Sequence, residues 1–321
     1  MEEIIIPQKY IGDNMQDEKY MFHYTSPEAL LNILENNTIR FTNCLFLNDI
    51  KEYNYAVEVI SDFIENADYD AQFKELVKET IVQIDKKNLS SFIEVSGRKV
   101  SIGYGEYYVL CGSLKQDYLP MWNYYVKGNN YLGYNFKISI ENIVKSLNNV
   151  RGKILHGKIV YEMEEQKEII KNYFAQAYQT WKEKVAKNLG ASITTIKILR
   201  AQCINNIINF IQDIRVFFKD AGFSHEKEYR IALFYNSKSS NSTTQQGEIK
   251  KGEIAEISKG YSIKNGVISP HLNVKFPVLP IEEICSSPTI EKELAKLGLK
   301  DWLQSANLKV ELKESKIKVR Y

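Results

Sequence analysis

Apolar and polar residues change their spacing along the chain, and these changes predict an alternation of short strands and helices. Tyr20–Tyr24 (YMFHY) is typical of a strand. Ser26 and Pro27 follow as a helix N-cap and a proline at the first helical position. Apolar residues then recur at helical spacing in 29–34, and 39–41 predicts a second strand. The chain is therefore expected to open with a strand, a helix and a strand.

The next stretch predicts more helices and a buried strand. A helix should begin after Leu47-Asn48-Asp49, because Asp49 and Glu52 have the spacing of a capping box. Asn48 takes no part in this cap and could face a ligand site. Tyr107–Cys111 is apolar throughout, as in a buried strand. Further helices are expected near 71–86 and 119–126, and further strands at 131–136, 153–161 and 228–235.

Residues 164–218 differ from the rest because apolar positions follow the helical period for about fifty residues, with a break near Gly190. This pattern predicts a helical hairpin inserted into one sheet-based domain that covers residues 1–321. A polar loop is expected at 237–246, then strands to about 276, a last helix at 289–304 and two closing strands in 309–321. The fold class predicted is α+β, with a mixed or antiparallel sheet and flanking helices.

Composition narrows the class of protein. The chain has 321 residues, of which 44% are hydrophobic and 26% charged, as in ordinary globular proteins. The net charge of +2 excludes a global polycation. The N-terminus does not resemble a signal peptide, and no apolar run approaches the roughly eighteen residues of a membrane span. No membrane partner is therefore expected. Four well-separated cysteines without a metal motif favour a reducing, cytoplasmic location.

Two polar segments are candidates for chemistry. His23-Tyr24-Thr25 lies where a strand turns into a capped helix, although a lone histidine there is more often structural. In the segment 226–230 (EKEYR), strand periodicity puts Glu226, Glu228 and Arg230 on one face. Burying these charges is costly unless they are paired or used, so a ligand site is favoured over a solvated Glu–Arg ladder.

An aromatic segment is the third candidate. Trp122, Tyr124 and Tyr125 cannot all point inward from one short helix, so at least one should face a groove or solvent. An exposed ring beside a polar cleft suits a flat ligand ring, whereas the alternative is an aromatic corner of the core.

These segments, taken in order, resemble a bacterial family of the domain-of-unknown-function kind. The blocks that carry the resemblance span residues 20–320 and are His23-Tyr24-Thr25, Leu47-Asn48-Asp49 with Glu52, Cys111-Gly112-Ser113 with Met121-Trp122 and Tyr125, Glu226–Arg230, and Ser315-Lys316-Ile317. That family is in turn similar to the ADP-ribosyltransferase fold of the His–Tyr–Glu kind, which has a split sheet and uses NAD as its substrate without a metal.

The resemblance implies roles for individual residues. His23 would bind the adenosine ribose, the backbone of Tyr24 the nicotinamide amide, and Glu228, or else Glu226, the nicotinamide ribose. Tyr124 or Tyr125 would stack on nicotinamide, although the Ser-x-x-Tyr that often precedes this tyrosine is absent. The remaining candidates for the NAD site are Thr25, Arg40 (toward a phosphate, or else a surface arginine), Asn48, Ser113, Trp122 and Arg230.

The function expected is ADP-ribosylation of a macromolecule by a bacterial toxin or antiviral effector. RNA is slightly favoured over protein as the acceptor, because lysines recur near the C-terminus and aromatic residues are plentiful. An antitoxin or inhibitor could dock on 164–218. The alternatives are an NAD glycohydrolase that uses the same site and a non-catalytic module that binds a nucleotide or a protein.

Overall fold

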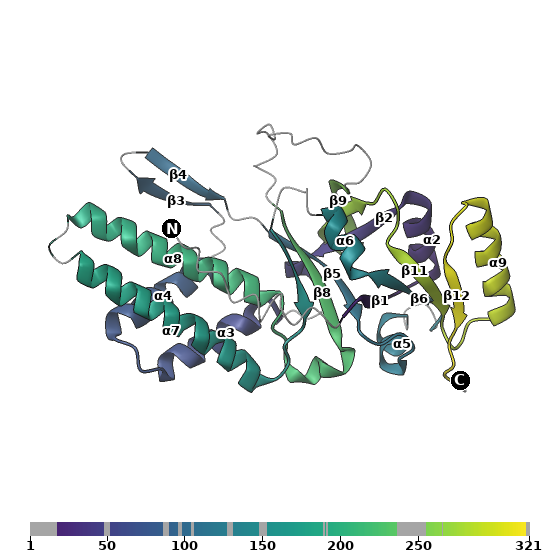
Figure 1. Cartoon of the computed structure of the whole chain (residues 1–321), viewed down its shortest axis with the longest axis horizontal. Coiled ribbons are helices and arrows are strands. Elements are labelled where there is room, and N and C mark those ends of the chain that lie inside the picture. The colour runs from purple at the N-terminus through teal and green to yellow at the C-terminus, as the bar shows by residue number, and fades with distance from the viewer. Residues whose placement is uncertain are drawn as a thin grey trace.

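The computed structural model describes residues 18–47, 52–85, 90–95, 98–103, 106–126, 131–147, 153–188, 190, 192–235, 255–264 and 266–318. Within these residues a large sheet with its own helices lies beside a group of four helices (Figure 1). Each part has its own apolar core. The fold is therefore α+β, as predicted from the sequence.

The first elements form where local signals place them. Strand β1 (Tyr20–Thr25) leads into α2 (Pro27–Asn36), and the Ser26 hydroxyl caps this helix by accepting a bond from the Ala29 amide at 3.2 Å. The helix ends at Asn37, whose left-handed backbone (φ 51°) turns the chain into β2 (Thr38–Asn43). The strand, helix and strand predicted for the start of the chain are confirmed.

The sheet has ten strands in the described part of the chain and is mostly antiparallel. Its main order is β12-β11-β6-β1-β5-β2-β10-β9, while β8 pairs with β5 and β7 pairs with β8. The remaining bounds are β5 (Glu106–Ser113), β6 (Tyr134–Ser139), β7 (Ile154–Lys158), β8 (Glu228–Tyr235), β9 (Glu256–Lys264), β10 (Val267–Lys275), β11 (Ile281–Ser286) and β12 (Glu311–Glu314). Only the β11–β12 pair is parallel among the strand pairs described, which makes the sheet mixed. A separate hairpin is formed by β3 (Ser90–Val95) and β4 (Arg98–Gly103).

The centre of the sheet is split along one edge of β5. The other edge of β5 pairs with β8 over its whole length, from Glu106 to Ser113. On the split edge, β2 pairs at Tyr108 and Val109, and β1 pairs only at Ser113. Between these two contacts, residues 110–112 have no strand partner on that edge among the described residues. The opening between β1 and β2 thus leaves backbone groups of β5 without a strand partner in the middle of the sheet.

The four helices beside the sheet bury a second core. They are α3 (Glu52–Asn66), α4 (Ala71–Asp85), α7 (Met163–Lys187) and α8 (Ile193–Arg215). Their contact residues include Ile60, Phe73, Phe174 and Ile211, each fully buried. The two long helices expected in 164–218 are therefore present, and they pack against α3 and α4. In Figure 1 this group lies at the left and the sheet at the right.

The smaller helices belong to the sheet, and here some expectations were wrong. Helix α5 (Leu119–Tyr125) was predicted, and α9 (Lys292–Ser305) begins slightly later than expected. Helix α6 (Ile140–Leu147) and strands β3 and β11 were not predicted. Of the two closing strands expected, β12 is present and residues 315–318 are not in a strand; the predicted loop 237–246 lies outside the described residues. No described helix has the length and apolar character needed to span a membrane.

Candidate functional site

A cavity of about 550 Å³ opens at the split in the sheet. It is bordered by β1, β2, β5, α5, the start of α3, and the segment from Lys219 to β8. Small-molecule sites are typically about 300–1,000 Å³, so the cavity has the size of a ligand site. The predicted residues that line it are His23, Tyr24, Arg40, Tyr124, Tyr125, Glu226, Glu228 and Arg230. The two distant segments predicted to form one site therefore do meet.

Glu228 and Arg230 form the centre of the site on β8. Arg230 Nε donates to Glu228 Oε1 at 2.7 Å, and its Nη2 donates to Oε2 at 2.9 Å. A third bond from Arg230 reaches the backbone oxygen of Val216 at 3.0 Å. Both side chains are buried, at 4% and 1% exposure. The bidentate geometry fixes the direction of the Glu228 carboxylate, because both of its oxygens are held at once.

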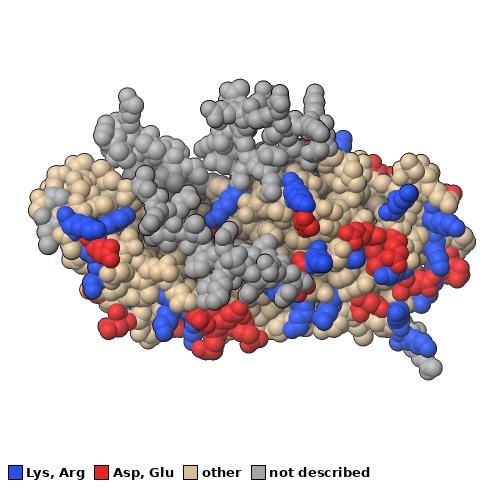
Figure 2. All heavy atoms as spheres, in the orientation of Figure 1, with Lys and Arg blue, Asp and Glu red and all other residues tan. Residues whose placement is uncertain are grey.

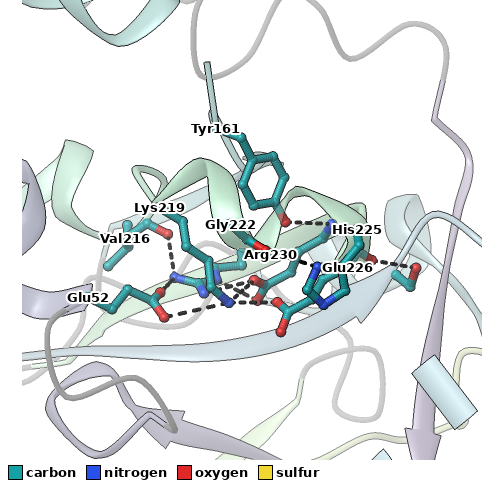
Figure 3. A network of polar contacts seen from close by, with 10 residues as sticks. Glu52, Tyr161, Val216, Lys219, Gly222, His225, Glu226 and Arg230 are labelled. Atoms are coloured by element: carbon teal, nitrogen blue, oxygen red, sulfur yellow. Dashed lines mark hydrogen bonds and ion pairs between the residues drawn. The ribbon is translucent and has the colours of Figure 1, made fainter. Parts of the chain in front are cut away.

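Three further charged residues complete a buried cluster around this pair (Figure 3). Lys219 Nζ donates to Glu226 Oε2 at 2.6 Å and to Glu228 Oε2 at 3.2 Å. Glu52 Oε2 lies 3.7 Å from the same Nζ, and Glu52 Oε1 forms an ion pair with Arg230. We call Glu52, Lys219, Glu226, Glu228 and Arg230 the charged cluster. All five are less than 10% exposed.

The cluster contains three carboxylates and two cations, so it carries one net negative charge when every member is ionised. Burial on its own would raise the pKa of Glu228, but the charges of Arg230 and Lys219 outweigh it and lower that pKa to about 2. For Glu226 burial dominates and, with the neighbouring Glu228, raises the pKa. Glu228 is therefore the fixed anion, whereas Glu226 holds a proton more easily than Glu228 does.

Glu226 reaches the cluster in a different way from the one its sequence position predicted. It ends a 3-10 helix, Ala221–Glu226, and Lys227 then adopts a left-handed backbone with φ 47°. Strand β8 begins only at Glu228, so the prediction that Glu226, Glu228 and Arg230 share one strand face is confirmed for the last two and wrong for Glu226. The turn instead brings the Glu226 carboxylate back onto Lys219.

Two side-chain hydroxyls hold this turn, that of Ser113 at the end of β5 and that of Tyr161 after β7. The Ser113 hydroxyl donates to the Glu226 backbone oxygen at 2.8 Å and accepts from the Lys115 amide at 3.1 Å. The Glu228 amide donates to the hydroxyl of Tyr161 at 3.1 Å. Ser113 does not line the cavity, so its predicted contact with NAD is not supported, and it acts on the turn instead.

His23 closes the opposite wall of the split. Its Nδ1 lies 2.8 Å from the backbone oxygen of Cys111, in the part of β5 without a strand partner on that edge. Because a carbonyl oxygen only accepts, Nδ1 carries the proton, and Nε2 is then the acceptor of a neutral ring. Burial lowers the pKa of His23 despite this bond, which favours the neutral form.

The aromatic helix α5 separates its rings as the sequence predicted. Tyr124 is 63% exposed and Tyr125 37%, and both line the cavity. The Tyr124 ring stacks on His225 with 4.9 Å between centroids. Trp122 is only 1% exposed, donates through Nε1 to Asp117 and packs edge-on against Tyr24. Trp122 is therefore a core residue, and its assignment to the NAD site is not supported.

The other predicted residues differ in their positions. Arg40 is exposed at the edge of the cavity. Tyr24 lines the cavity, and its hydroxyl donates to the backbone oxygen of Lys115 at 2.8 Å. Thr25 is buried and does not line it, so a contact with a ligand is not supported. Asn48 lies outside the described residues.

Two members of the charged cluster were not predicted as site residues. Lys219 follows the apolar end of α8, and no motif marks it in the sequence. Glu52 was interpreted as half of a capping box with Asp49, but its carboxylate faces Arg230 and Lys219. Asp49 lies outside the described residues.

One comparison with known proteins gives a match, and it covers part of this site. No curated protein and no solved structure gives a significant match to the chain. Residues 121–231 match the family model described as "Protein of unknown function (DUF2971)". This segment begins in α5 and ends in β8, so it contains Tyr124, Tyr125, Lys219, Glu228 and Arg230 but not His23. The match supports the domain-of-unknown-function family expected from the sequence, for this segment of the chain.

Proposed function

We propose that the cavity binds NAD and that the chain cleaves its bond to nicotinamide, transferring ADP-ribose to a macromolecular acceptor. One observation carries the proposal: Glu228 is held as an oriented anion, in a cluster with excess negative charge, on the wall of a ligand-sized cavity. The nicotinamide ring of NAD is a cation, and the ribose becomes cationic as the bond breaks. A buried anion placed before the ligand arrives favours both charges.

The reaction balances without a further reactant. The N-glycosidic bond to nicotinamide breaks, and its electron pair moves to the ring nitrogen and neutralises that ring. The ribose carbon develops oxocarbenium character, as in glycoside hydrolysis. An oxygen or nitrogen of the acceptor then attacks this carbon and loses a proton. Glu228 stabilises the charge on the ribose, and Arg230 keeps Glu228 ionised and in place.

The surrounding residues suit the remaining groups of NAD. His23 Nε2 is an acceptor and can bind a ribose hydroxyl. The partly exposed ring of Tyr125 can stack on nicotinamide, and Arg40 at the edge of the cavity can pair with a phosphate. These assignments rest on position and chemistry, and each can be tested by substitution.

RNA and protein are both candidate acceptors. On the face seen in Figure 2, Lys and Arg side chains of the described residues are interspersed with Asp and Glu and do not form one basic surface. Near the C-terminus, Lys313 is paired with the buried Glu283. RNA and protein are therefore both to be offered as acceptors.

The test compares two substitutions of buried, cation-paired glutamates. Glu228→Gln removes the proposed catalytic anion and leaves two carboxylates with two cations in the cluster. Glu283→Gln is the matched control, because Glu283 is 3% exposed, pairs with Lys313 and lies outside the cavity. We expect nicotinamide release from NAD to fall roughly 10²–10³-fold in Glu228→Gln, the usual effect of removing one electrostatic stabiliser, and to stay near the wild-type rate in the control.

NAD labelled in its ADP-ribose part, incubated with RNA, DNA and cell protein, then shows where that part goes. Label on a macromolecule supports transfer, and label only in free ADP-ribose identifies an NAD glycohydrolase. If the wild type and Glu228→Gln release nicotinamide at the same rate with every acceptor, the enzymatic proposal is wrong and the cavity is a binding site only.

A further inference from the structure

Strand β9 forms one end of the large sheet and presents an open edge. It is the last strand in the sheet order, and it pairs with β10 along its whole length, from Glu256 to Lys264. Its other edge has no strand partner among the described residues (Figure 1). An open edge of nine residues is a template for pairing with another strand, because its backbone donors and acceptors point outward.

The β9–β10 hairpin extends past the core that supports its base. On one face of β10, Val274 and Leu272 are fully buried, whereas Ile268 near the turn is 67% exposed. The facing residues of β9 change in the same way. Ile257 packs against the core, and Ile263, which is directly opposite Ile268, is 79% exposed. The apolar face of the hairpin therefore extends beyond the core that covers its base.

The sequence of β9 is complementary to itself when read in the opposite direction. In E-I-S-K-G-Y-S-I-K, an antiparallel copy centred on Gly260 puts Glu256 opposite Lys264 and Ile257 opposite Ile263. The same register pairs positions 258 with 262 and 259 with 261, which are serine with serine and lysine with tyrosine. Opposite charges and apolar pairs in these positions stabilise a strand pair.

Other registers lack this match. A shift of the centre by one residue, to Lys259, would place that lysine directly beside its own copy, and like charges opposite each other are destabilising. Lysines on an edge strand commonly prevent pairing. In the Gly260 register, however, each lysine of β9 faces a glutamate or a tyrosine. The charges of β9 thus favour pairing in this one register, whereas edge lysines usually disfavour pairing in any register.

We propose that β9 pairs with β9 of a second copy of the chain, antiparallel and with a twofold axis at Gly260. A self-complementary patch is what a twofold interface requires. The pairing sets the exposed Ile263 of each copy beside Ile257 of the other, on the same face. The exposed end of one hairpin then lies against the covered base of the other, and the two sheets become continuous.

Gly260 suits the axis of this interface. A Cβ at this position would lie 2.5 Å from His271 Nε2 and 2.7 Å from Asn273 Nδ2, so the strand takes no larger residue without moving these side chains. At the axis, two copies of residue 260 are opposite each other. The two glycines add no side-chain contact at the axis, so the flanking pairs, Glu256 with Lys264 and Ile257 with Ile263, set the register.

Oligomeric state tests the proposal directly. Sedimentation velocity on the full chain should show a monomer–dimer equilibrium, and Ile263→Lys should shift it to monomer. Val278→Lys is the control, because Val278 is also exposed, at 76%, but lies outside the hairpin. A wild type that stays monomeric over the whole concentration range overturns the proposal, as does a dimer that is unaffected by Ile263→Lys.

A cysteine pair tests the register. In the double variant Ser258→Cys/Ser262→Cys, the two positions of one chain are about 13 Å apart along the strand, too far to bond. Across the proposed axis their Cβ atoms are about 4.5–5.5 Å apart, near the separation that a disulfide needs. Mild oxidation should give a covalent dimer linked between positions 258 and 262, and the two single variants should not give it. Equal cross-linking in the single variants refutes the register.

Discussion

Replacing Lys219 with methionine tests the reasoning about the charged cluster most directly. The Nζ of Lys219 is 2.6 Å from a carboxylate oxygen of Glu226 and 3.2 Å from one of Glu228, with Glu52 at 3.7 Å. Methionine is similar in length and apolar, so the substitution removes the charge with little change in volume. Three buried carboxylates would then face one cation, and the net charge of the cluster would change from −1 to −2.

The expected loss of stability is large. Removing one partner of a buried ion pair typically costs about 3–5 kcal/mol, because the remaining charge stays buried without compensation. A folded domain has only about 5–15 kcal/mol in total, so the free energy of unfolding should fall by a sizeable fraction at neutral pH. The control is Lys145→Met, since Lys145 and its partner Glu141 are 67% and 71% exposed, and such helical surface pairs contribute about 0.3–0.5 kcal/mol.

The pH dependence gives the sharper result. In the wild type the folded-state pKa of Glu228 is lowered from 4.5 to about 2, as burial is outweighed by its two cations. This corresponds to about 3 kcal/mol of stability that is present above pH 4.5 and lost as the pH falls toward 2. Without Lys219 the pKa values of Glu226 and Glu228 in the folded state rise, because the charge of Lys219 lowers both. The variant then takes up a proton on folding, and its deficit relative to the wild type shrinks on acidification.

Urea unfolding followed by tryptophan fluorescence, at neutral pH and at about pH 5, measures both effects. The deficit of Lys219→Met should be largest at neutral pH and smaller at the lower pH, while Lys145→Met stays close to the wild type at both. A deficit below about 1 kcal/mol at neutral pH would refute the reasoning, since it would mean that the excess charge is not buried. So would a deficit that is the same at both pH values.

Two further substitutions separate the site from the structure around it. Ser113→Ala removes the hydroxyl that holds the Glu226 backbone, so we expect the protein to lose about 1 kcal/mol of stability. Nicotinamide release should be slower, with little change in the KM for NAD. An unchanged rate of release would show that the turn is held without this hydroxyl. Trp122→Phe removes the bond from Nε1 to Asp117 and should cost about 1.5–3 kcal/mol, measured by urea unfolding, while NAD affinity measured by calorimetry is unchanged. A loss of NAD affinity would instead indicate that Trp122 contributes to the NAD site.

Local signals explain which elements could be predicted. The cap at Ser26 and the proline after it are sufficient to place α2, and a long helical period places α7 and α8. Helix α6 was missed although Ile140, Ile143 and Leu147 have helical spacing, because it follows β6 without a break and is short. Strand β11 was missed because its pairing with β6 joins residues far apart in sequence, which periodicity over six residues does not reveal.

The same distinction applies to the candidate site. Glu228 and Arg230 could be placed together because strand alternation fixes their common face. The position of Glu226 depends on the left-handed backbone of Lys227, which no local pattern required. Lys219 comes from the end of the helical group, and its partners are set by how that group packs beside the sheet. Charge partners that are set by the packing of distant segments cannot be predicted from the residue pattern of a single sequence.

The charged cluster joins the two apolar cores of the chain. Glu52 begins α3 and Lys219 follows α8, both in the helical group, while Glu228 and Arg230 lie in the sheet. On the ribosome, Glu52 is therefore made well before the residues that neutralise it. Its carboxylate must remain hydrated until the chain has grown past Arg230 and the helices have docked. Assembly of the site is thus a late step of synthesis, and a chain truncated before β8 would contain His23 without Glu228 and Arg230.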